Sequence, residues 1–70
     1  MPEMTPVESS NIAAVGHDDA TGEMFVEFIS GGTYAYAGVP YSVAQDLIAS
    51  PSPGAYLARH IKGRYSYRRA

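Results

Sequence analysis

The chain contains no cysteine, and this absence most strongly limits how so short a sequence can hold a fold. Its 70 residues allow one domain. A single core of this size supplies no more than about 3–5 kcal/mol of stability, so such domains usually gain a disulfide, a structural metal or a partner subunit. Because no disulfide and no thiolate metal site is available, we expect a homo-oligomer. A monomer that folds alone is the alternative.

The ends of the chain give a first division of the sequence. No stretch is long and apolar enough for a transmembrane helix, and residues 1–10 lack the basic and apolar regions of a signal peptide. We therefore expect a cytoplasmic domain with no membrane partner. Two prolines and no periodicity predict a flexible N-terminal lead-in at residues 1–8. The folded domain is expected over residues 9–67, followed by a basic C-terminal end at residues 68–70.

Alternating side chains predict an antiparallel meander of three strands, over residues 11–16, 23–29 and 33–37. Turns rich in Asp and Gly separate these strands. In the second strand, Met24, Val26 and Phe28 form a wholly apolar face that should point into the core. In the third strand, Tyr34 and Tyr36 alternate with alanine and should project from one face together.

Helical spacing of apolar residues begins after the meander. Pro40 suits the first position of a helix, which should extend through residues 42–49. Ser52 and Pro53 suit the start of a second helix, in which Tyr56 and His60 stack, and Gly63 suits its end. Residues 64–69 form either a last strand or an extended arm. The expected fold is therefore α+β: a three- to four-stranded antiparallel meander followed by one or two short helices.

Charge is unevenly distributed along the sequence. All seven acidic residues lie between Glu3 and Asp46, and all five basic residues lie between Arg59 and Arg69, which leaves a net charge of −2. Two interpretations fit this asymmetry equally well. The basic tail is an anion-binding arm, or it pairs with the acidic half of another subunit.

Three short motifs have both a chemical and a structural interpretation. His17 could be a general base but is better explained as an exposed turn residue. Asp18 and Asp19 could bind a divalent cation, although two adjacent carboxylates offer fewer oxygens than such ions usually need. Gly31 and Gly32 could cradle a phosphate, but a hairpin turn fits their place between two strands better. We therefore expect no enzyme activity, no catalytic residue, no metal and no cofactor.

The aromatic and basic residues are the most informative set for function. Tyr side chains that stack on bases, with Arg and Lys nearby for phosphates, are typical of sites for single-stranded nucleic acid. Packing in the core or at a subunit interface is the alternative role of these tyrosines. Ser52 and Gly54, at a helix start near Arg59 and Lys62, form a further anion-binding candidate. The candidate ligand-binding residues are Tyr34, Tyr36, Ser52, Gly54, Arg59, Lys62, Arg64, Tyr65, Tyr67, Arg68 and Arg69.

The order and spacing of several motifs resembles the KTSC domain, which is found at the C-terminus of some lysyl-tRNA synthetases and as free-standing bacterial and phage proteins. The similar segments are residues 9–12, 15–16, 18–19, 24–28, 34–36 and 38–40, with Ser52, Gly54, Tyr56, Ile61 and Tyr65. The resemblance extends over residues 7–67. His17 departs from it, because the family often has an aromatic residue there, and so do Pro51 and Pro53, which flank Ser52. The resemblance implies a small α+β domain and no established reaction.

Three functions remain open at this point. The first is a homo-oligomeric module that binds a nucleotide or cyclic nucleotide, for example a phage protein that sequesters a cyclic nucleotide signal of bacterial defence. The second is an RNA- or tRNA-binding module, as the synthetase-attached relatives suggest. The third is a protein–protein interaction or assembly domain. The acidic overall composition favours a small anionic ligand over a long polyanion, whose binding depends on phosphate neutralisation.

Overall fold

Five antiparallel strands, each paired with its neighbour in sequence order, form one sheet with the order β1-β2-β3-β4-β5. The computed structural model describes residues 2–70. Its strands are β1 (Thr5–Pro6), β2 (Ile12–Asp18), β3 (Glu23–Phe28), β4 (Thr33–Tyr36) and β5 (Tyr67–Arg69). The central meander β2-β3-β4 confirms the predicted topology. Of the two forms left open for residues 64–69, the structure shows a strand, at Tyr67–Arg69, and it extends the sheet beyond β4.

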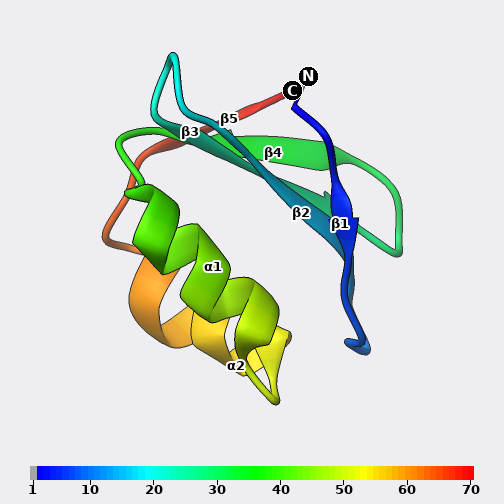
Figure 1. Cartoon of the computed structure of the whole chain (residues 1–70). Helices are drawn as coiled ribbons and strands as arrows, with labels where there is room; N and C mark the ends of the chain where they lie inside the picture. Colours follow the sequence, from blue (N-terminus) through cyan, green and yellow to red (C-terminus); the bar gives the residue numbers. More distant parts are fainter. Residues whose placement is uncertain (1) are drawn as a thin grey trace.

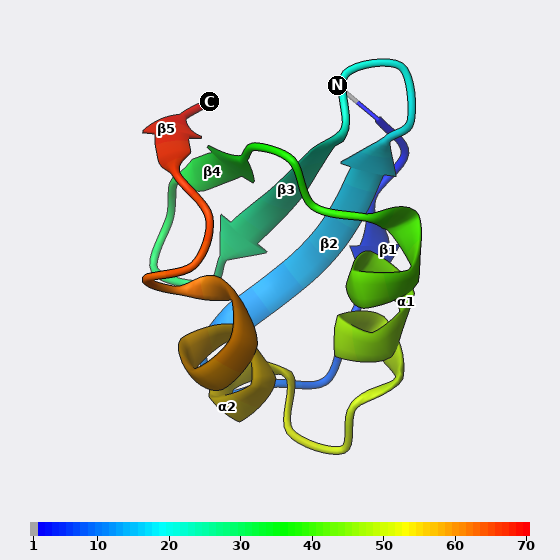
Figure 2. The same cartoon turned by 90° about the vertical axis from the view of Figure 1, so that its left-hand side faces the viewer.

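The helices cover one face of this sheet and leave the other face open (Figure 1). They are α1 (Tyr41–Ala49) and α2 (Pro53–Tyr56), and a π-helical turn, η1 (Leu57–Ile61), continues α2. Figure 2 shows the chain leaving η1 and rising along the sheet into β5. Within residues 2–70, no helix has the length and apolar character needed to cross a membrane.

The core lies between the helices and the sheet. Its buried residues are Ile12, Val15, Met24, Val26, Tyr36, Val39, Ala44, Leu47, Leu57 and Ile61. As predicted from the alternation in β3, Met24 and Val26 are fully buried there and Phe28 packs partly against them. The second helix begins after Ser52 with Pro53 at its first position, and it ends before Gly63, whose φ of +83° suits glycine.

The open face of the sheet is partly covered by the N-terminal segment. The sequence predicts a flexible lead-in at residues 1–8, but residues 5–6 form β1 and pair with Ala14 and Val15. The residues just before β1 cross over Gly16, where an added Cβ would lie 2.8 Å from the Glu3 carbonyl oxygen. A side chain at this position of β2 would therefore displace the segment, and glycine permits the close approach.

Two smaller boundaries differ from the sequence prediction. Strand β2 continues to Asp18, beyond the predicted end at Gly16, because its ladder with β3 reaches the pair Asp18–Glu23. Pro40 is the N-cap of α1 and not its first helical residue, since its ψ of 148° is extended and the helix begins at Tyr41. The helix therefore begins one residue after Pro40, the predicted first position.

Candidate functional site

Strand pairing gathers three tyrosines on the helix-facing side of the sheet. Tyr34 and Tyr36 share a face of β4, as predicted from their alternation with alanine. In the antiparallel register, Tyr67 of β5 lies opposite Tyr36, and Arg69 lies opposite Tyr34. Directly opposed residues project from the same face, so all four side chains lie on the side that carries the helices.

The aromatic rings of this group are in contact. The Tyr34 and Tyr67 rings stack with their centroids 5.5 Å apart, and the Tyr36 and Tyr67 rings are 5.6 Å apart. Phe28 meets Tyr34 edge-on at 5.7 Å. The Arg69 guanidinium lies over the Tyr34 ring, 6.0 Å from its centroid, a distance at which a cation is attracted to the ring face.

Phe28 and the three tyrosines form one wall of a hollow of about 430 Å³, which we call the aromatic hollow. Its lining residues are Phe28, Ser30, Gly31, Tyr34, Tyr36, Lys62, Gly63 and Tyr67. The β3–β4 turn supplies Ser30 and Gly31, and the end of the second helix supplies Lys62 and Gly63. The hollow is within the size range of small-molecule sites, and it combines aromatic surface with a few polar groups, as such sites do.

The three tyrosines differ in exposure and therefore in what they can do. Tyr36 is 3% exposed and belongs to the core, whereas Tyr67 is 63% exposed and offers a ligand the ring surface that Tyr34 and Tyr36 leave uncovered. Burial raises the pKa of the Tyr36 hydroxyl, and the neighbouring Tyr67 and Tyr34 raise it further. Tyr36 therefore keeps its proton at physiological pH and remains a hydrogen-bond donor toward the hollow.

Ser52 and Gly54 lie apart from the aromatic hollow, in a second, polar hollow of about 480 Å³ beside the chain before β2. Gly54 lies against Asn11, because an added Cβ would be 2.5 Å from the Asn11 Oδ1. Ser52 occupies the N-cap of α2, but its side chain makes no capping hydrogen bond. Arg59 and Lys62 do not line this hollow, so the proposed grouping of these four residues is not formed.

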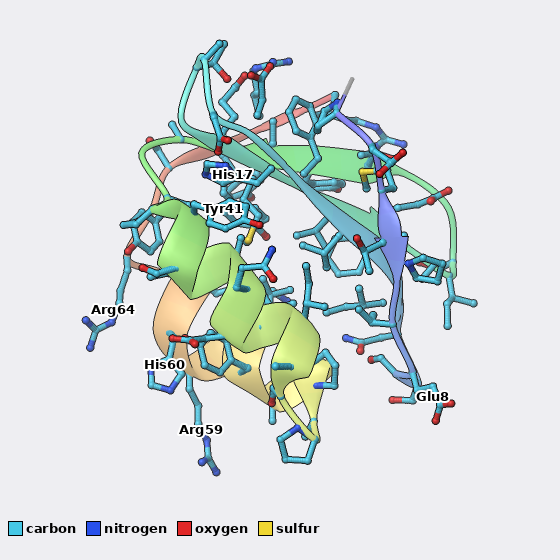
Figure 3. The ribbon with its side chains drawn as sticks, in the orientation of Figure 1. Glu8, His17, Tyr41, Arg59, His60 and Arg64 are labelled. Atoms are coloured by element: carbon cyan, nitrogen blue, oxygen red, sulfur yellow. The ribbon has the colours of Figure 1, made fainter. Side chains whose placement is uncertain are left out.

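The remaining basic and aromatic candidates are dispersed. Arg59 and Arg64 are exposed and point into solvent on the helical side of the molecule (Figure 3). Tyr65 packs partly against the core. Arg68 lies on the open face of the sheet, where its Nε and Nη2 donate to the Glu23 carboxylate at 3.1 and 3.2 Å. Among the basic residues that the structure describes, Lys62 alone lines the aromatic hollow, and Arg69 lies near it over the Tyr34 ring.

Comparison with known proteins assigns this fold to a protein family. The family model described as KTSC domain matches residues 8–65, which is most of the chain. The chain belongs to the KTSC domain family. A crystal structure of a KTSC domain protein from Yersinia pestis superimposes with a TM-score of 0.91 and 32% identity, covering 97% of this chain and 96% of that one.

Two kinds of relative share this KTSC domain. A protein of Tsukamurella paurometabola is 42% identical over 62 residues, which cover 89% of this chain and 92% of the relative. The lysine–tRNA ligase of Nostoc sp. is 38% identical over 60 residues, which cover 86% of this chain. The match spans only 11% of that ligase, so the similarity concerns one small part of it.

His17 of the KTSC domain has a structural role and is not the exposed turn residue that the sequence predicts. It lies within β2, and its side chain is 7% exposed. Its Nδ1 lies 2.7 Å from the Asp19 carboxylate, and its Nε2 lies 2.6 Å from the Val39 carbonyl oxygen. Both ring nitrogens therefore already have partners, and neither is free to act on a substrate. Within residues 2–70, no three His, Asp or Glu side chains are placed to hold a metal ion.

Sequence reasoning missed part of the aromatic hollow. Phe28, Ser30, Gly31 and Gly63 line it, but the sequence assigns them only to the core face, a turn and a helix end. A place for Phe28 at the border of the core could have been predicted, since the last inward residue of a strand often lies there. The approach of Lys62 and Gly63 to the β3–β4 turn had no local signal, because it depends on how the second helix packs on the sheet.

Proposed function

We propose that this KTSC domain is a non-enzymatic cytoplasmic module that binds a nucleotide-type ligand in the aromatic hollow. The observation that carries the proposal is the convergence of Tyr34, Tyr36 and Tyr67 with Lys62 around one hollow. The Arg69 guanidinium lies nearby, over the Tyr34 ring. The exposed Tyr67 ring stacks on the base, and the two cations meet phosphate oxygens. The hydroxyl of Tyr36 is available to hydrogen-bond polar groups of the ligand.

A ligand with one or two phosphates suits this arrangement better than a long polyanion. Of the five basic residues, Lys62 lines the hollow and Arg69 lies over the ring of Tyr34, and the whole chain has a pI near 5.5. Proteins that bind long nucleic acids through many phosphates carry strongly basic surfaces. A small domain that holds a free nucleotide, including a cyclic one, could act by sequestering it, as a phage protein would against a nucleotide signal of bacterial defence.

Calorimetric titration with AMP, GMP, cyclic di-AMP and cyclic di-GMP tests the proposal. Tyr67→Ala should weaken binding by roughly tenfold or more, since stacking on one base is worth about 1–3 kcal/mol. Tyr41→Ala is the matched control, because Tyr41 is likewise exposed, at 55%, but lies outside the hollow. No binding of any probe at about 1 mM, which corresponds to about −4 kcal/mol, removes the proposal.

RNA is the second candidate, and the similarity to a segment of lysine–tRNA ligases favours it. The same titration with a single-stranded oligoribonucleotide distinguishes the two ligands. RNA binding should weaken steeply with salt and depend on the exposed Arg59 and Arg64. Nucleotide binding in the hollow should depend on Tyr67 and Lys62 and leave the Arg59→Gln variant unaffected.

A further inference from the structure

Strand β5 forms an edge of the sheet (Figure 2). Half of the backbone groups of an edge strand point away from its neighbour. Ser66 and Ala70 both bond to β4, through Ala37 N to Ser66 O at 2.9 Å and Ala70 N to Thr33 O at 2.8 Å. Inward and outward residues alternate along an antiparallel strand. Arg68 therefore also faces β4, and the N–H and C=O groups of Tyr67 and Arg69 face outward.

The two arginine side chains of β5 do not extend across this edge to keep another strand away. Charged side chains that extend from an edge strand usually keep other strands away. Here the Arg68 side chain turns back to Glu23 of the same chain, and the Arg69 side chain turns back over Tyr34. The Tyr67 ring is exposed at this edge, beside the outward backbone groups of Tyr67 and Arg69.

We propose that β5 of a second copy of this chain pairs with this edge, in antiparallel orientation about a two-fold axis at Arg68. This register places Tyr67 of each copy opposite Arg69 of the other, and each such pair exchanges both of its N–H···O bonds. It uses every outward group of Tyr67 and Arg69 in both strands, which no other symmetric register does. A second copy would also add stability to a small domain that has no cysteine and therefore no disulfide.

The pairing also extends the aromatic hollow, a consequence that rests on the proposed function. Directly opposed residues share a face, so Arg69 of the partner subunit lies beside Tyr67 on the helix-facing side. The two hollows then lie side by side across the axis, each with a cation from the other copy at its border. A ligand with two phosphates or two bases would fit such a paired site better than a single nucleotide would.

Cysteine cross-linking tests the register directly, because the chain has no cysteine of its own. Residue 68 faces its own copy across the axis as a non-hydrogen-bonded pair, whose Cα atoms lie about 4.5 Å apart, within the range of a disulfide. The Arg68→Cys variant should oxidise to a covalent dimer roughly tenfold faster, or more, than Arg59→Cys, whose cysteine lies on the exposed helical side. Equal rates for the two variants overturn the register.

Proline at residue 69 tests the edge itself. Arg69→Pro removes an outward N–H without breaking the ladder with β4, whereas Arg69→Ala loses the same side chain and keeps the N–H. Native mass spectrometry should show dimers for the wild type and Arg69→Ala, and monomers for Arg69→Pro. A wild-type monomer at every concentration overturns the inference, even if that monomer binds nucleotides and so upholds the proposed function. A dimer that binds no nucleotide supports the strand pairing and removes the proposed function.

Discussion

Tyr36 is the residue in which core packing and the candidate site meet. Its ring is among the core residues, and it also lines the aromatic hollow. Burial of the side chain penalises the charged phenolate, and the two neighbouring tyrosines add to that penalty when they ionise. The pKa of Tyr36 is therefore higher in the folded chain than in the unfolded chain, and stability must depend on pH at the alkaline end.

Stability should fall as the pH rises above about 10, where an unfolded tyrosine loses its proton and the folded Tyr36 still keeps it. In that range the folded state binds more protons than the unfolded state, so the free energy of unfolding decreases with pH. Tyr36→Phe should reduce the decrease, and Tyr41→Phe should not. Urea denaturation at about pH 8 and about pH 10.5 measures the difference. An unchanged slope in Tyr36→Phe would contradict the assignment.

At the scale of elements, the loop before β2 is fitted closely to the start of α2. The Ser9 hydroxyl donates to Asn11 Oδ1 at 2.8 Å, and this bond holds the amide against Gly54. The close approach explains a glycine inside a helix, where alanine would be favoured by about 0.5–1 kcal/mol if there were space for its methyl group. Gly54 thus serves packing, whatever its role in binding.

The contact predicts that the effect of Gly54→Ala on the free energy of unfolding depends on Asn11 and changes sign when Asn11 is replaced. Gly54→Ala should destabilise the wild type by about 1 kcal/mol, because the new methyl group meets the Asn11 amide. In an Asn11→Ala background the same substitution should be neutral or stabilising, since only helix propensity remains. Chemical denaturation of the four proteins gives the coupling. An equal effect of Gly54→Ala in both backgrounds would remove the steric explanation.

Element-level patterns in the sequence predicted the meander, both helices and the shared face of Tyr34 and Tyr36, because these depend on local alternation and spacing. They did not predict the burial of Phe25, which lies on the open face and is 6% exposed. They also missed β1, since pairing over two residues leaves no periodicity. Which tail residues join the hollow depends on the register of β5 with β4, and no local pattern encodes that register. The sequence therefore did not show that Tyr67 and Arg69 lie at or near the hollow and that Tyr65, Arg64 and Arg68 do not.

At the scale of the whole molecule, one small core supports everything else. The helices and sheet enclose a cluster of buried side chains, and among the described residues Arg68 pairs with Glu23 while His17 makes a hydrogen-bond contact with Asp19. The Arg68–Glu23 pair is largely exposed on the arginine side and contributes little, since pairs at the surface are worth about 0–1 kcal/mol. Stability therefore comes mainly from apolar burial, and the free energy of unfolding that one small core provides is low.

Truncation of one core residue should consequently abolish the fold. Leu57→Ala removes a fully buried side chain, at a cost of about 2–5 kcal/mol, which is comparable to the whole stability of so small a core. We expect the variant to show no cooperative thermal transition by circular dichroism. Ile29→Ala, at a side chain that is 59% exposed, is the control and should melt like the wild type. A Leu57→Ala protein that still unfolds cooperatively near the wild-type temperature would show that other contacts dominate.

The two borders of the sheet are unlike each other. Strand β1 is two residues long and ends in Pro6, which has no N–H to offer, so this border presents almost nothing to a further strand. A filament of subunits joined by strand pairing requires two unpaired sheet edges on every subunit, one for each of its two neighbours. Over residues 2–70 this sheet offers one such edge, at β5. The pairing proposed for β5 should therefore stop at two subunits, and raising the concentration should produce pairs and no filaments.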